Sequence, residues 1–134
     1  FSVLAGCNSP VEKVEKAEEN VDQAKMELEQ AKKDLEQYRA DSARYTEIVA
    51  KQIAANKQRI ADLRAEAKKA RKELRKNLEK QIDELEQKNS ELEKRLALYR
   101  YERKEQWEKF KREFDHDIND LGDALRNFSK DNTK

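Results

Sequence analysis

Between Pro10 and Gly122 the chain contains neither proline nor glycine, the two residues that most often interrupt a helix. Over the same stretch apolar residues recur at alternating steps of three and four, which is the spacing of a coiled-coil seam. Together these features predict an all-α protein made of long helices. The first seam consists of Val14, Ala17, Val21, Ala24, Leu28, Ala31, Leu35, Tyr38, Ser42, Tyr45, Val49 and Gln52.

Three further apolar series follow, separated by slips in the heptad phase. Each slip marks either a stutter within one helix or a point where the chain turns over. A single helix over this whole stretch would be about 165 Å long, so we favour turns. The three series are Ile53, Asn56, Ile60, Leu63, Ala67, Ala70 and Leu74; Leu85, Asn89, Leu92, Leu96 and Tyr99; and Trp107, Phe110, Phe114, Ile118, Leu121, Leu125 and Phe128.

Two capping patterns suggest where helices begin. Ser9 can cap the first helix, Pro10 suits its first turn, and Glu12 completes a Ser-x-x-Glu capping box. Ser90 and Glu93 form a second box. The pattern therefore predicts one helix start at Pro10 and another just after Ser90.

Charge suggests how the helices pack. Residues 11–36 carry nine acidic and five basic side chains, and residues 57–80 carry ten basic and four acidic ones. A turn near residue 48 would lay these segments antiparallel, with opposite charges facing each other. We therefore predict an elongated antiparallel three-helix bundle with coiled-coil-type packing; a long hairpin or rod that dimerises is the alternative. The predicted bundle spans 9–129, with helices at about 10–47, 50–88 and 91–128 and a frayed tail at 130–134.

The sequence offers no candidate catalytic site. His116 is the only histidine, and with Asp120 it has the i,i+4 spacing of half a metal site. No second histidine or cysteine lies nearby to complete it, so we interpret this pair as a solvated helix face. A thin bundle also offers no cleft that would shift a pKa for acid–base chemistry. We predict no catalytic residue, no metal site and no cofactor, and we do not expect an enzyme.

A dense basic block is the strongest candidate for binding a polyanion. It could contact nucleic-acid phosphates, but no aromatic residue interleaves with it, and the net charge of the whole chain is only +1. We expect the acidic first helix to neutralise it, and we therefore do not expect nucleic-acid binding. We likewise expect Trp107, Phe110 and Phe114 to be core rather than a lipid-facing stripe. The block consists of Lys68, Lys69, Arg71, Lys72, Arg75 and Lys76.

The N-terminal residues carry the most specific motif. Leu4-Ala5-Gly6-Cys7 resembles the lipobox of bacterial lipoproteins, in which the cysteine is lipidated and becomes the first residue of the mature chain. The resemblance implies that residues 1–8 are the remnant of a signal peptide with its lipid-attachment site at Cys7. Asn8, in place of an aspartate after the cysteine, then suggests the periplasmic side of the outer membrane. No run of about 18 apolar residues predicts a transmembrane helix.

A weaker resemblance covers the last third of the chain. Residues 107–122 are similar to small helical proteins of Bacteroidota, some of them labelled stress-response, and carry no catalytic motif. We expect a non-enzymatic, lipid-anchored envelope protein that acts as a helical spacer, scaffold or protein-binding module. Its partners would be the membrane, through Cys7, and another protein or a second copy through the helical seams. The alternatives are an amphipathic lipid binder of apolipoprotein type and a nucleic-acid-binding helical protein.

Overall fold

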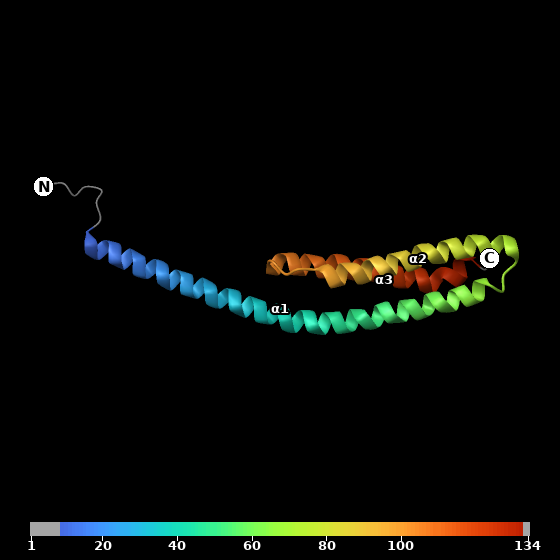
Figure 1. Cartoon of the computed structure of the whole chain (residues 1–134), viewed down its shortest axis with the longest axis horizontal. Helices are drawn as coiled ribbons and strands as arrows, with labels where there is room; N and C mark the ends of the chain where they lie inside the picture. Colours follow the sequence, from blue (N-terminus) through green and yellow to red (C-terminus); the bar gives the residue numbers. More distant parts are fainter. Residues whose placement is uncertain (1–8, 133–134) are drawn as a thin grey trace. The chain divides into compact units, whose positions relative to one another are not determined.

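The computed structural model describes residues 9–132, with side chains as far as Phe128. Within this range the chain forms three helices and no strand: α1 (Pro10–Ala67), α2 (Lys72–Leu98) and α3 (Lys104–Asn132) (Figure 1). All three contribute to one apolar core. The prediction of an all-α, antiparallel three-helix bundle is therefore confirmed.

The chain divides into two compact units, and the division falls within α1 between Arg39 and Ala40. We call residues 10–39 the N-terminal segment and residues 40–132 the bundle. The predicted bundle began at residue 9, but the observed one begins at residue 40. The reason is length, because α2 and α3 contain 27 and 29 residues and cannot cover an α1 of 58.

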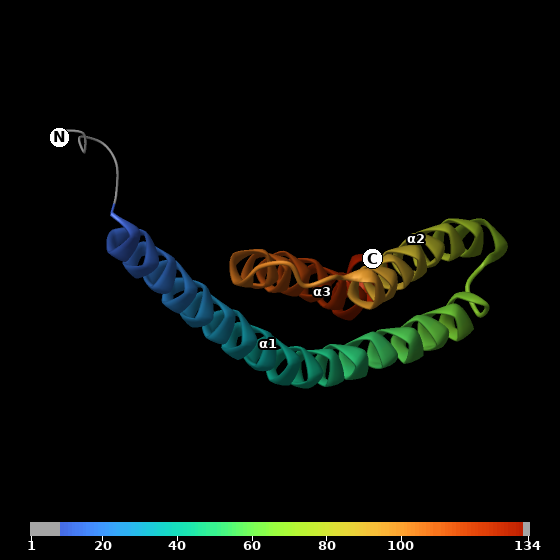
Figure 2. The ribbon, with the colours of Figure 1, turned by 60° about the vertical axis from the view of Figure 1, so that its left-hand side comes forward.

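Within the bundle, α2 and α3 run antiparallel and side by side, and the part of α1 that follows Ala40 lies along them (Figures 1 and 2). The core residues keep the three- and four-residue spacing of the predicted seams. Burying these side chains provides most of the stabilisation of such a bundle. They are Val49, Ile53, Ile60, Leu63 and Ala67 of α1; Leu78, Ile82, Leu85 and Leu92 of α2; and Phe114, Ile118, Leu121, Leu125 and Phe128 of α3.

The start of α1 agrees with the capping pattern. The backbone N–H of Glu12 donates to Oγ of Ser9 at 3.1 Å, and the N–H of Lys13 donates to the carbonyl oxygen of Ser9 at 3.0 Å. The first bond satisfies an N–H group that the first helical turn leaves without an intrahelical acceptor, and the second is the first backbone bond of the helix. The predicted helix start at Pro10 is confirmed.

The predicted turns near residues 48 and 89 are wrong. Residues 48–56 contain no helix breaker, and Val49 and Ile53 are needed in the core, so α1 continues to Ala67. The chain turns instead at 68–71 and at 99–103. The first turn coincides with the basic block, where a continuing helix would place Lys68 four residues from Lys72, and like charges at this spacing destabilise a helix. The last helix accordingly spans 104–132 rather than 91–128.

The predicted pairing of residues 11–36 with residues 57–80 is also wrong, because residues 11–36 and 57–67 belong to the same helix. The cations of α1 pair with α2 instead. Lys57 Nζ lies 2.8 Å from a carboxylate oxygen of Glu93, and the Arg64 guanidinium lies 2.8 and 3.0 Å from carboxylate oxygens of Asp83 and Glu86. Residues 79–93 carry six acidic and two basic side chains. This second acidic stretch is the partner that the sequence analysis overlooked.

Candidate functional site

His116 lies on an exposed face of α3. Its Nε2 is 3.2 Å from a carboxylate oxygen of Asp120, and both side chains are mostly exposed. Within residues 9–132 no group of three or more histidine, cysteine, aspartate or glutamate side chains is arranged to hold a metal ion. The pair is therefore a solvent-facing interaction between neighbouring helical turns.

The basic block forms the turn between α1 and α2 and the first turn of α2. Arg75 curls back toward this turn, where its Nη2 donates to the carbonyl oxygen of Ala70 at 3.3 Å. Arg71, just before α2, has an extended backbone and makes no side-chain cap. Most of the block is exposed. Its arrangement is that of a solvated loop, without the interleaved aromatic side chains that stack on nucleic-acid bases.

Aromatic side chains gather where the turn between α2 and α3 meets α1. Trp107 and Phe114 are buried and Phe110 is half-buried, so the prediction that this stripe is core is confirmed. The ring of Tyr99 stacks on Phe110 with centroids 4.3 Å apart, and the ring of Tyr45 meets Trp107 edge-on at 5.6 Å. Offset and edge-to-face arrangements of this kind stabilise aromatic clusters beyond area burial alone.

A polar network, which the sequence analysis missed, surrounds this cluster. Asp41 of α1 accepts a hydrogen bond from Nε1 of Trp107 at 2.7 Å and another from Nζ of Lys111 at 2.6 Å. The hydroxyl of Tyr45 donates to a carboxylate oxygen of Asp115 at 2.6 Å. The donors and acceptors lie 66 to 70 residues apart in sequence. Only the packing of α1 against α3 brings them together.

The electrostatics of this network favour fixed pairs over proton transfer. Hydrogen bonds from Lys111 and Trp107 lower the pKa of Asp41 below its usual value. Burial acts to lower the pKa of Lys111, but the bond and charge of Asp41, with Glu108, raise it overall. Burial, followed by the hydrogen bond to Asp115, raises the pKa of Tyr45. Every one of these shifts moves the group further from neutral pH, whereas a general acid or base needs a pKa near it.

A second polar feature lies in the middle of the core. Asn89 of α2 is buried, at 2% exposure. Its Oδ1 accepts a hydrogen bond from Nδ2 of Asn56 at 3.1 Å, and its Nδ2 donates to the carbonyl oxygen of Ile53 at 3.3 Å. The sequence analysis placed both asparagines on apolar seams but did not pair them. Their isolation among apolar seam residues was the available signal.

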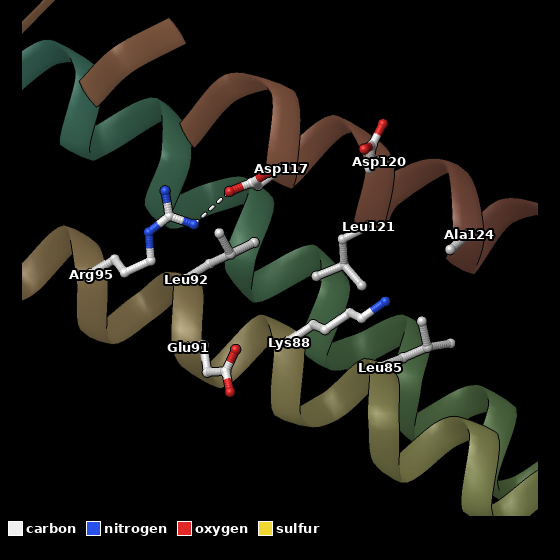
Figure 3. Close-up of a pocket in the computed structure, with 9 residues that line it drawn as sticks. All are labelled: Leu85, Lys88, Glu91, Leu92, Arg95, Asp117, Asp120, Leu121 and Ala124. Atoms are coloured by element: carbon white, nitrogen blue, oxygen red, sulfur yellow. Dashed lines mark hydrogen bonds and ion pairs between the residues drawn. The ribbon is translucent and has the colours of Figure 1, made fainter. Parts of the chain in front are cut away.

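A shallow groove of about 280 Å³ lies between α2 and α3 (Figure 3). Leu85, Leu92 and Leu121 provide its apolar lining. At one end Nη1 of Arg95 donates to Oδ2 of Asp117 at 2.6 Å and links the two helices. The groove is slightly smaller than the roughly 300–1,000 Å³ of small-molecule sites. Charges of both signs line the groove, so it selects no single ligand charge.

The N-terminal segment contrasts with the bundle in its burial. Every side chain from Pro10 to Lys33 is exposed, including five large apolar ones. In the described part of the chain no side chain before Val49 is buried. The exposed apolar residues of this segment are Val11, Val14, Val21, Met26 and Leu28.

Cys7, the predicted lipidation site, lies outside the described residues. In the part of the chain that the structure describes, no helix has an apolar stretch long enough to span a bilayer. Comparison with models of protein families, with curated proteins and with solved structures found no match. The functional argument therefore depends on the geometry and on the motifs of this chain.

Proposed function

We propose that this chain is a non-enzymatic, lipid-anchored protein of the bacterial envelope, in which the N-terminal segment is a helical spacer between the anchor and the bundle. The observation that carries this proposal is the exposure of every side chain from Pro10 to Lys33 within a helix that continues into a packed core. A helix that is exposed in its first part and packed in its last part is suited to act as a tether for a folded bundle.

The position of the lipobox-like motif supports the role of the N-terminal segment as a tether. Cys7 precedes the first helical residue, Pro10, by only three positions. A lipid attached there would therefore be followed almost directly by a helix, and the 30 residues of the N-terminal segment would span about 45 Å. Acyl chains contribute roughly 0.8 kcal/mol per buried CH₂, and two or more chains anchor a protein stably.

The bundle supports the non-enzymatic part of the proposal. Its interior is filled with apolar side chains, and its main polar contacts are paired across helices. The shifted pKa values of Asp41, Lys111 and Tyr45 all lie further from neutrality than usual. These features suit a rigid scaffold or protein-binding module.

The anchor can be tested in a bacterial host that processes lipoproteins. The natural open reading frame, with its own leader, is expressed alongside a Cys7→Ser variant, and the membrane fraction is analysed by intact mass. We expect a mature chain that begins at an acylated Cys7, and a Cys7→Ser variant that carries no lipid. A natural chain that keeps residues 1–6 and carries no lipid would contradict the proposal.

A further inference from the structure

The exposed apolar residues of the N-terminal segment are arranged as a heptad seam. With positions labelled a to g, the a positions carry larger apolar residues and the d positions carry alanine. The described a residues up to Leu28 are all exposed. The a residues are Val14, Val21, Leu28 and Leu35, and the d residues are Ala17, Ala24 and Ala31.

From these positions we infer that residues 13–35 pair with the same residues of a second copy of this chain, in a parallel and in-register coiled coil. The first argument is charge. In such a dimer each g residue faces the e residue five positions later in the partner helix, and these pairs set partner choice and orientation. Lys13 then faces Glu18 of the second copy, and Glu27 faces Lys32 of the second copy.

The remaining complete g–e pair is neutral on one side, because Asn20 faces Lys25 of the second copy. By the twofold symmetry of the dimer each pair occurs twice, so the segment gains four attractive pairs and no like-charge pair. A sequence selected only as a solvated tether has no need for this pattern.

The orientation follows from the a positions rather than from charge. An antiparallel pair would bring e positions to face e positions and g positions to face g positions. Each set carries both signs, since Glu18 shares the e positions with Lys25 and Lys13 shares the g positions with Glu27. Opposite charges could therefore pair in an antiparallel dimer as well. The β-branched Val14 and Val21 at a positions suit a parallel two-stranded coil, and on this ground we assign the parallel orientation.

The bundle sets the end of the paired region. From Asp41 onward the continuation of this seam is occupied, because Asp41 bonds Trp107 and Lys111 and the Tyr45 ring contacts Trp107. The intermolecular seam must therefore end before these residues. Residues 13–35 span about 35 Å of helix, and their alanine-rich d layer buries little area. We expect an association of moderate strength that depends on concentration.

The inference does not depend on acylation, so it is tested with the full chain carrying Cys7→Ser. Sedimentation equilibrium over a wide concentration range should show the mass rising from the 15.8 kDa monomer toward a dimer. Leu28→Glu should weaken association at least about 100-fold, because two buried leucines are replaced by two facing carboxylates. Met26→Glu is the matched control: Met26 is equally exposed but lies at an f position, away from the seam, and its replacement should leave association unchanged.

The charge argument has its own test. Glu27→Lys creates two like-charge pairs with Lys32 of the second copy and should weaken association about 5- to 20-fold. The double variant with Glu27→Lys and Lys32→Glu restores opposite charges and should recover most of the loss. If the double variant associates no better than the single one, the assigned register is wrong.

Orientation is tested by placing the only cysteine at the N-terminal end of the seam. In the Cys7→Ser background, Val14→Cys should form an intermolecular disulfide in the dimer, because parallel in-register helices bring the two residues within bonding distance. A dimer that never forms this disulfide would contradict the parallel register. A chain that stays monomeric at all concentrations would overturn the inference, and so would one whose N-terminal segment binds lipid vesicles without self-association.

Discussion

A buried asparagine in an apolar seam lowers the stability of a bundle but favours one packing register over the others. Asn89 is buried at 2% exposure, its Oδ1 accepts a hydrogen bond from Asn56, and its Nδ2 donates one to the Ile53 carbonyl. If α2 slid along α1 by one heptad, Asn89 would lose both partners and remain buried, which is unfavourable by roughly 1–3 kcal/mol. A single polar residue in a seam is the best-attested device for fixing register.

This role predicts opposite effects for single and double variants. Asn89→Ala should lower the free energy of unfolding by about 2 kcal/mol, because it removes two bonds and leaves the Asn56 amide without its partner. Replacing both Asn56 and Asn89 with leucine should give a chain at least as stable as the natural one, since no polar group is then left unpaired. Urea unfolding followed by circular dichroism measures both. If the double variant is as unstable as the single one, the asparagine pair makes a net contribution to the stability of the bundle and does not act only on register.

Asp41 makes the stability of the bundle depend on pH. Its pKa is lowered in the folded state by Lys111 and Trp107. The stabilisation is therefore complete above the ordinary pKa of 3.8 and is lost as pH falls through the lower folded value. Asp41→Asn should lower the free energy of unfolding by about 1–2 kcal/mol at pH 7, and this difference should shrink below pH 4.

The measurement can use the fluorescence of Trp107, which is the only tryptophan and donates to Asp41. Asp22→Asn, on the exposed N-terminal segment, is the control and should change stability by less than about 0.5 kcal/mol at either pH. A gap between the natural chain and Asp41→Asn that is as wide at pH 3 as at pH 7 would contradict this assignment.

At the scale of the helices, the periodicity identified the core but not the turns. The core residues Val49, Ile53, Ile60 and Leu63 were all on predicted seams. The turns were misplaced because the chain lacks proline and glycine at either end of α2, and a phase slip alone does not distinguish a stutter from a turn. Like charges crowd at 68–72, but Lys72 and Lys76 have the same spacing inside α2, so charge did not mark the first turn either.

The continuity of α1 can be tested with proline. Ala54→Pro lies inside α1 and should destabilise the bundle by about 3 kcal/mol or more, because proline removes a helical hydrogen bond and clashes with the preceding turn. Lys72→Pro is the matched control, since Lys72 is the first residue of α2 and Arg71 already has the extended backbone that precedes proline. Thermal unfolding compares the two. If Ala54→Pro left the stability of the bundle unchanged, α1 would not be continuous at residue 54 and the predicted turn near residue 48 would be supported.

At the scale of the molecule, contacts between distant segments were beyond the reach of sequence reasoning. The bond between Trp107 and Asp41 joins residues 66 positions apart. Predicting it requires knowing where α1 stops, and that boundary was wrong. The network at the aromatic cluster was therefore missed even though Trp107 itself was correctly assigned to the core.

The division of α1 between two units predicts uneven hydrogen exchange along one helix. Amides of residues 10–33 should exchange much faster than those of residues 49–67, because exposed helical bonds open locally without unfolding the core. Mass spectrometry on dilute protein measures the difference. Raising the protein concentration should slow exchange at residues 10–33 if they pair between chains. Uniform protection along α1 in dilute protein would contradict this picture.

The sequence separation of the interhelical contacts also predicts the order in which they form during folding. The bonds from Arg64 to Glu86 and from Arg95 to Asp117 each close a loop of 22 residues, whereas the bond from Trp107 to Asp41 closes one of 66. Tripling the loop adds about 1 kcal/mol of closure entropy. We therefore expect the short-range contacts to form in the rate-limiting nucleus and the Asp41 network to form after it. Asp41→Asn should consequently accelerate unfolding while leaving the refolding rate nearly unchanged in stopped-flow experiments, whereas a variant that breaks the Arg64 pairs should slow refolding.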